Sequence, residues 1–116
     1  RGEDEIRRAL DTVHALRTRA REVGVSGNRE YNPGWHTALD LTHLLTVSEA
    51  ITRSAIERKE SRGGHFRDDY HYKSPEFGGF NFVIRKGEGP QGEMQLERVP
   101  IPPMPPELTA IIEEMK

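Results

Sequence analysis

One long segment, from Asn32 to the pair Gly63-Gly64, restricts the fold of this chain more than any other feature. It opens with Asn32-Pro33, where asparagine is a favoured N-cap and proline is tolerated in the first helical turn. After Gly34 it contains no proline or glycine until the pair is reached. The segment therefore predicts one helix over residues 33–62, roughly 40 Å long at 1.5 Å per residue.

The middle of this predicted helix is apolar around most of its circumference. Its polar side chains form one narrow stripe of Thr42, Thr46, Glu49 and Arg53. A helix of this kind is usually buried on several sides. We expect other helices or another domain to cover the surface that a single partner helix leaves open. The apolar positions are Leu39, Leu41, Leu44, Leu45, Val47, Ala50, Ile51 and Ala55.

A first helix is predicted over residues 3–23, because apolar residues recur there at helical spacing and Gly24 is a natural stop. The short loop that follows forces the two helices to run antiparallel. His14 falls on a charged face of the first helix, where we expect it to be solvated.

The second half of the chain predicts a β-hairpin and a tail. Residues 80–85 alternate like a strand, Met94–Arg98 form a second strand, and the glycine-rich tip at 87–93 is expected to be mobile. A proline-rich connector then leads to a short helix at 107–115. The fold class is therefore mainly α: an antiparallel helical hairpin, spectrin-repeat-like, with a C-terminal β-hairpin and a short terminal helix. We expect residues 1–65 to form the helical segment and residues 66–116 to pack on it, within one domain.

Composition excludes several functions. The 17 basic residues are balanced by 19 acidic ones, so nothing indicates nucleic-acid binding. The chain has no cysteine, which rules out a disulfide, a thiolate nucleophile and a Cys-ligated iron–sulfur cluster. No dinucleotide fingerprint and no membrane-spanning apolar run is present. We therefore expect no catalytic residue, no cofactor-binding residue and no membrane span in this stretch.

Two groups of histidine and aspartate are close enough in sequence to suggest a metal. Neither matches a strong ligand signature. We interpret the first group, at residues 65–71, as hydrogen-bonded loop residues. We interpret the second, at residues 36–43, as an Asp–His pair packed against a neighbouring domain. We predict no metal site. The groups are His65, Asp68, Asp69 and His71, and His36, Asp40 and His43.

A dense charge cluster surrounds the glycine pair that ends the long helical segment. One interpretation is a solvated helix end, whose exposed ion pairs contribute at most about 1 kcal/mol each. The other is a docking element, because arginine forks suit carboxylates and carbonyls and a glycine pair permits close approach of another backbone. The docking candidates are Arg58, Glu60, Ser61, Arg62, His65, Arg67 and Asp68.

The cluster is also a recognisable motif. The run Glu60-Ser61-Arg62-Gly63-Gly64-His65-Phe66-Arg67-Asp68-Asp69-Tyr70, with Asn32-Pro33-Gly34-Trp35 upstream, resembles the C-terminal helical domain of succinate dehydrogenase and fumarate reductase flavoprotein subunits. The chain departs from many relatives at Gly64, where alanine is common, and at His71, where proline often follows the tyrosine.

The resemblance implies a parent protein that binds FAD in a Rossmann-like domain and closes a capping domain over a dicarboxylate. It also implies an iron–sulfur subunit as partner and a cytoplasmic location, free or on the cytoplasmic face of a membrane. The family's FAD-binding, substrate-binding and proton-donating residues lie in parts absent here, so this stretch is expected to be inactive alone. In the family this loop lies against the flavin-binding and capping domains, which favours the docking interpretation.

Two alternatives remain. L-aspartate oxidases carry a comparable helical domain, but theirs usually ends soon after the motif, whereas about 45 residues follow it here. The chain could instead be an autonomous helical interaction module. Because it starts without methionine, we expect it to be part of a longer polypeptide.

Overall fold

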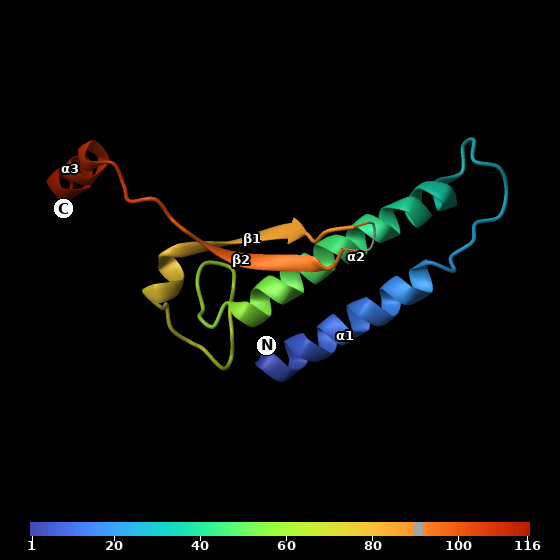
Figure 1. The fold of residues 1–116 in the computed structure, drawn as a ribbon, viewed down its shortest axis with the longest axis horizontal. Coiled ribbons are helices and arrows are strands. Elements are labelled where there is room, and N and C mark those ends of the chain that lie inside the picture. Colours follow the sequence, from blue (N-terminus) through green and yellow to red (C-terminus); the bar gives the residue numbers. More distant parts are fainter. Residues whose placement is uncertain (90–91) are drawn as a thin grey trace.

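A computed structural model describes residues 1–89 and 92–116. Two helices are followed by a short 3₁₀ turn, a β-hairpin and a terminal helix (Figure 1). This order confirms the predicted fold class. The elements are α1 (Glu3–Ala20), α2 (Pro33–Glu57), η1 (Glu76–Gly78), β1 (Phe80–Lys86), β2 (Met94–Pro100) and α3 (Pro106–Glu114).

Helices α1 and α2 lie side by side and run in opposite directions, as predicted. Acidic residues fill the first turn of α1 and basic residues its last turn, which suits the helix dipole. In α2 the side chain of Asn32 accepts a hydrogen bond from the backbone N–H of Trp35, so the predicted N-cap is confirmed. Helix α1 ends at Ala20, three residues before the predicted end at Val23, in a turn stabilised by backbone bonds.

The predicted end of α2 at Arg62 is wrong. The helix stops at Glu57, and Arg58 already has an extended conformation with φ −82° and ψ 92°. The residues that follow bond across a tight loop instead, where the backbones of Arg62 and His65 pair with each other. Contacts with residues far along the chain stabilise this loop in place of a continued helix.

Strands β1 and β2 form a two-stranded antiparallel sheet with Phe80 opposite Pro100 and Lys86 opposite Met94. The second strand is two residues longer than predicted. Gly87 closes the described end of the hairpin by donating its N–H to the carbonyl of Glu93 at 2.8 Å. A Cβ at Gly87 would lie 2.6 Å from that carbonyl oxygen, so only glycine fits there. Of the predicted mobile tip, residues 90–91 lie outside the described part of the chain.

The molecule is elongated and its core is small. The radius of gyration is 19.7 Å, compared with about 13 Å for a compact domain of this length. Among the described residues, the buried apolar side chains are those of Leu45, Ile56 and Phe77. Helix α3 lies at the end of an extended connector, away from the two long helices (Figure 1). None of the described helices combines the length and the hydropathy that crossing a bilayer requires.

Helix α2 keeps a large apolar surface that α1 does not cover. Leu44, Val47 and Ile51 are more than half exposed, at 60%, 57% and 64%. This confirms the prediction that one partner helix is too little for α2. The predicted polar stripe is not uniformly solvated, because Glu49 is only 2% exposed and faces α1.

Candidate functional site

The loop after α2 is organised around the carboxylate of Glu60, which is 0% exposed. Its Oε1 accepts hydrogen bonds from Arg58 Nη1 at 2.6 Å and Arg62 Nε at 2.9 Å. Its Oε2 accepts one from the backbone N–H of Ser74 at 2.9 Å. The bond from Arg62, followed by those from Ser74 and Arg58, outweighs the effect of burial and lowers the pKa of Glu60 to about 2. Both ends of the loop are thereby tied to one ionised side chain.

Arg67 is the second buried charge of the loop and is also 0% exposed. It forms a fork with Asp69, from Nε at 2.7 Å and from Nη2 at 2.6 Å. Its Nη1 donates to the carbonyls of Ala55 at 2.7 Å and Ile56 at 3.2 Å. Carbonyls in the last turn of a helix have no partner within the helix, so Arg67 caps α2 from a distance in sequence. The fork holds the pKa of Asp69 well below its usual range.

Ser61 and His65 complete this network. The hydroxyl of Ser61 accepts from the backbone N–H of Arg67 at 2.9 Å and donates to the carbonyl of Tyr70 at 2.7 Å. His65 Nε2 lies 3.1 Å from the carbonyl oxygen of Arg58, so that nitrogen carries a proton. Gly63, between the paired residues of the turn, has a φ of 58°, a conformation that favours glycine.

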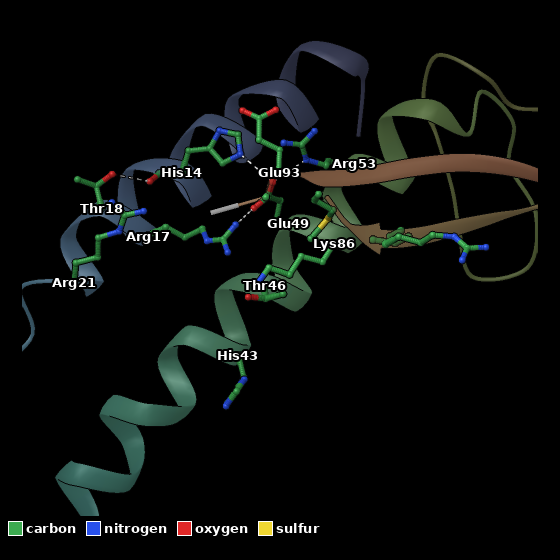
Figure 2. Close-up of a pocket in the computed structure, with 14 residues that line it drawn as sticks. His14, Arg17, Thr18, Arg21, His43, Thr46, Glu49, Arg53, Lys86 and Glu93 are labelled. Atoms are coloured by element: carbon green, nitrogen blue, oxygen red, sulfur yellow. Dashed lines mark hydrogen bonds and ion pairs between the residues drawn. The ribbon is translucent and has the colours of Figure 1, made fainter. Parts of the chain in front are cut away.

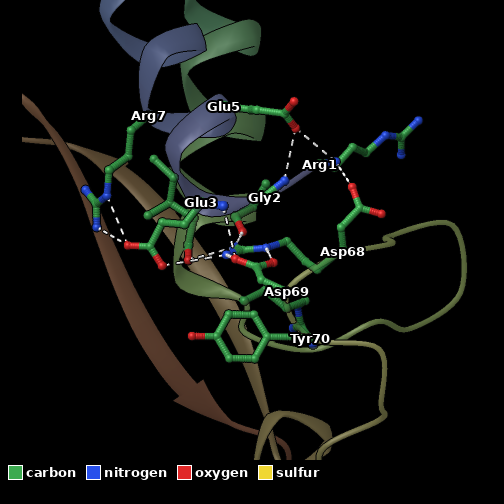
Figure 3. Close-up of polar contacts among 12 residues, drawn as sticks. Arg1, Gly2, Glu3, Glu5, Arg7, Asp68, Asp69 and Tyr70 are labelled. Carbon is green, nitrogen blue, oxygen red and sulfur yellow. Dashed lines mark hydrogen bonds and ion pairs between the residues drawn. The ribbon is translucent and has the colours of Figure 1, made fainter.

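The loop is also joined to the start of α1 (Figure 3). Asp69 accepts a hydrogen bond from the backbone N–H of Glu3 at 3.0 Å, and the side chain of Glu3 lies 3.6 Å from Arg67. The ring of Tyr70 lies 5.1 Å from the Arg67 guanidinium. Residues 66 positions apart in sequence are therefore connected through one arginine.

The docking candidates fall into two groups. Arg58, Glu60, Ser61, His65 and Arg67 are buried or half-buried and bonded within the domain. Arg62 is also bonded within the domain, to Glu60 and to the carbonyl of Ser74, but it exposes 40% of its side chain, and Asp68 exposes 60%. The cluster is thus an internal brace that presents two charged side chains to its surroundings, and its docking role remains a prediction.

Neither histidine–aspartate group forms a metal centre in the described part of the chain, where no three His, Cys, Asp or Glu side chains gather as ligands. One imidazole of each group packs against an aromatic ring instead. His71 is stacked on Phe66 with ring centroids 5.5 Å apart, and His36 meets Trp35 edge-on at 5.3 Å.

A second buried carboxylate was not singled out from the sequence. Glu49 on α2 accepts hydrogen bonds from Arg53 Nε at 2.8 Å and from Arg17 on α1, and it lies 3.3 Å from His14 Nε2 (Figure 2). Burial raises the pKa of Glu49, but the bonds from Arg53 and His14 and the charge of Arg17 bring it below its usual value. His14 is exposed as predicted, at 45% of its side chain, but its contact with this buried carboxylate was not predicted. The four-residue spacing of Glu49 and Arg53, which makes them neighbours on one helix face, is the sequence feature that could have indicated this ion pair.

Comparison with known proteins agrees with the motif. The family described as "Fumarate reductase flavoprotein C-term" matches residues 1–110. The chain is similar to one in the structure of Mycobacterium smegmatis Sdh1 in complex with UQ1, with a TM-score of 0.87 and 39% identity, covering 97% of this chain and 19% of that one.

Two curated relatives show how far the likeness extends. The fumarate reductase flavoprotein subunit of Haemophilus influenzae is 38% identical over 71 residues, 60% of this chain and 12% of that protein. The L-aspartate oxidase of Streptomyces coelicolor is 36% identical over 70 residues, again 60% of this chain and 12% of that protein. This chain spans a fifth or less of the length of these relatives. The chain belongs to the C-terminal domain family of fumarate reductase and succinate dehydrogenase flavoprotein subunits, within the flavoprotein oxidoreductases.

Proposed function

We propose that this domain serves a parent flavoprotein that binds FAD and interconverts succinate and fumarate. In that protein the domain packs against the flavin-binding and capping domains and takes no part in the chemistry. An iron–sulfur subunit accompanies the parent chain, in the cytoplasm or on the cytoplasmic face of a membrane. Family membership supports the parent's activity, and the shape of the domain supports its packing role.

The large accessible surface area of the domain is the observation that supports packing against other domains. It measures 9137 Å², whereas a compact monomer of 13.2 kDa exposes about 6,400 Å². Exposed apolar side chains on α2 and α3 contribute to the difference. Large exposed apolar patches mark interaction sites, so a domain of this shape is suited to being covered by other parts of a larger protein.

The residues of this domain do not fit FAD themselves. Dinucleotide sites use a glycine-rich turn between a parallel strand and a helix, where the helix N-terminus meets the phosphates. In the described residues the sheet is a two-stranded antiparallel hairpin, and Gly87 and Gly89 lie at its tip. The flavin therefore belongs to the remainder of the proposed parent, and no catalytic step is assigned to a side chain here.

The rival within the same superfamily is an L-aspartate oxidase. The hairpin and α3 follow the shared motif in this chain. The match to the Mycobacterium smegmatis chain covers 97% of this chain and so extends past the motif, which favours the succinate and fumarate enzymes. The alignments with the curated fumarate reductase subunit and with the oxidase each cover 60% of this chain and do not separate the two. The extended shape also disfavours an autonomous helical module, which would need a larger core of its own.

The test uses the full-length flavoprotein. We expect bound FAD together with succinate oxidation or fumarate reduction, and no oxidation of L-aspartate. Oxidation of L-aspartate without succinate or fumarate turnover would instead support the rival. For the docking role, Asp68→Asn should reduce FAD retention, whereas the control Asp11→Asn, at an exposed position on α1, should not.

A further inference from the structure

A cavity of about 1080 Å³ lies between α1, α2 and the described part of the hairpin (Figure 2). It is separate from the loop at residues 58–74, and the motif residues discussed above do not line it. Its charged lining residues are Arg17, Arg21, Glu49, Arg53, Arg85, Lys86 and Glu93, and the imidazoles of His14 and His43 line it as well.

The cavity is positively charged, although the whole chain has a net charge of −2. Five arginine and lysine side chains line it, against two carboxylates. Glu49 is buried and already bound by Arg17 and Arg53. Arg21 and Lys86 have no ion-pair partner within residues 1–89 and 92–116. Two cations, one directly after α1 and one at the end of β1, are therefore available to an acidic group that enters the cavity.

The volume of the cavity indicates an occupant larger than a small anion. Sites for small molecules measure about 300–1,000 Å³, so this cavity, at about 1080 Å³, is slightly larger than that range. A lone phosphate or carboxylate would leave most of it empty. The apolar side chains of Ile84 and Met94 also line it, which suits a stretch of polypeptide with both apolar and acidic side chains.

We infer that this cavity receives an acidic segment of the parent flavoprotein from outside residues 1–116, with carboxylates against Arg21 and Lys86. The inference rests on the proposed function, because it requires the remainder of that polypeptide. Relatives are long enough to supply it, since this chain spans only 12–19% of their length. Charge complementarity specifies the occupant as Asp- or Glu-rich.

Zero-length carbodiimide cross-linking of the full-length flavoprotein tests this inference, because the reagent joins a lysine amine to a carboxylate only when they touch. We expect mass spectrometry to find Lys86 joined to an Asp or Glu outside residues 1–116 of the same polypeptide. Arg21→Glu should lower the yield of that cross-link severalfold by repelling the segment. Arg19→Glu is the matched control, because Arg19 is exposed in the last turn of α1 but does not line the cavity.

Several results would overturn the inference. Lys86 joined only to residues within 1–116, to a second copy or to another subunit would name a different occupant. No cross-link and full reactivity of Lys86 toward an amine reagent would show an open cavity. Protection of Lys86 only on addition of inorganic phosphate would indicate a site for a free anion. None of these measurements uses turnover, so they remain decisive even if the proposed succinate and fumarate activity fails its own test.

Discussion

Replacement of Arg67 by alanine should open the loop after α2 while leaving the rest of the domain folded. Arg67 is fully buried and makes four hydrogen bonds: two to Asp69 and one each to the carbonyls of Ala55 and Ile56. Arg67→Ala removes all four at once. It leaves a carboxylate without its cation and two carbonyls at the end of α2 without a partner.

The size of the effect follows from the burial of each group. Breaking a buried ion pair by removing one partner costs about 3–5 kcal/mol. Asp69 retains 32% exposure of its side chain and keeps its bond to the backbone of Glu3, so part of its charge regains water. We therefore expect Arg67→Ala to cost about 3 kcal/mol, the lower end of this range. This free energy corresponds to roughly a hundredfold change in the equilibrium between the closed and the open loop.

Hydrogen exchange of the full-length flavoprotein, followed by mass spectrometry, measures this opening locally. The amides of Ser61, Arg67 and Tyr70 should lose about two powers of ten in protection in Arg67→Ala, while the β1–β2 hairpin stays unchanged. Arg67→Lys keeps the charge but cannot form the fork, so its amide protection should lie between that of the native protein and that of Arg67→Ala. The reasoning is refuted if alanine lowers protection less than tenfold, or if lysine matches the native protein.

Three further predictions concern the same loop and the exposed face of α2. The pKa of Glu60 is lowered from 4.5 to about 2, so its bonds stabilise the loop fully above pH 4.5 and are lost as the pH falls toward 2. Hydrogen exchange of the loop should show this pH dependence in the native protein but not in Glu60→Gln. Gly63→Ala should destabilise the loop by about 1 kcal/mol because of its positive φ, whereas Gly64→Ala, where a Cβ meets nothing within 4 Å, should be neutral or better in thermal melts. Residues 1–116 alone should bind a dye that reports apolar surface and should self-associate in light scattering, because α2 exposes apolar side chains. The double variant Val47→Ser and Ile51→Asn should reduce both dye binding and self-association. Equal dye binding by this variant would show that the exposed face of α2 is not the apolar surface responsible.

The elements that were predicted correctly are those set by local sequence. The Asn32 cap, the helical repeats of α1 and α2 and the alternation of β1 depend on neighbours within a few residues. The end of α2 was predicted wrongly because its determinants are distant. Ser74 bonds Glu60 from 14 residues away, and Arg67 reaches the carbonyl of Ala55 from 12 residues away.

The candidate site divides in the same way. The motif around Gly63-Gly64 identified the family and named the charged residues, since both are properties of sequence order. The sequence did not reveal that Glu60 and Arg67 are buried, because an exposed ion pair and a buried one have the same residue types. The contact of Arg17 with Glu49, and the cavity beside it, exist only once α1 lies antiparallel to α2. Local propensity and capping therefore determined the elements of this chain, and long-range packing decided which of its charges are buried and which remain available to a partner.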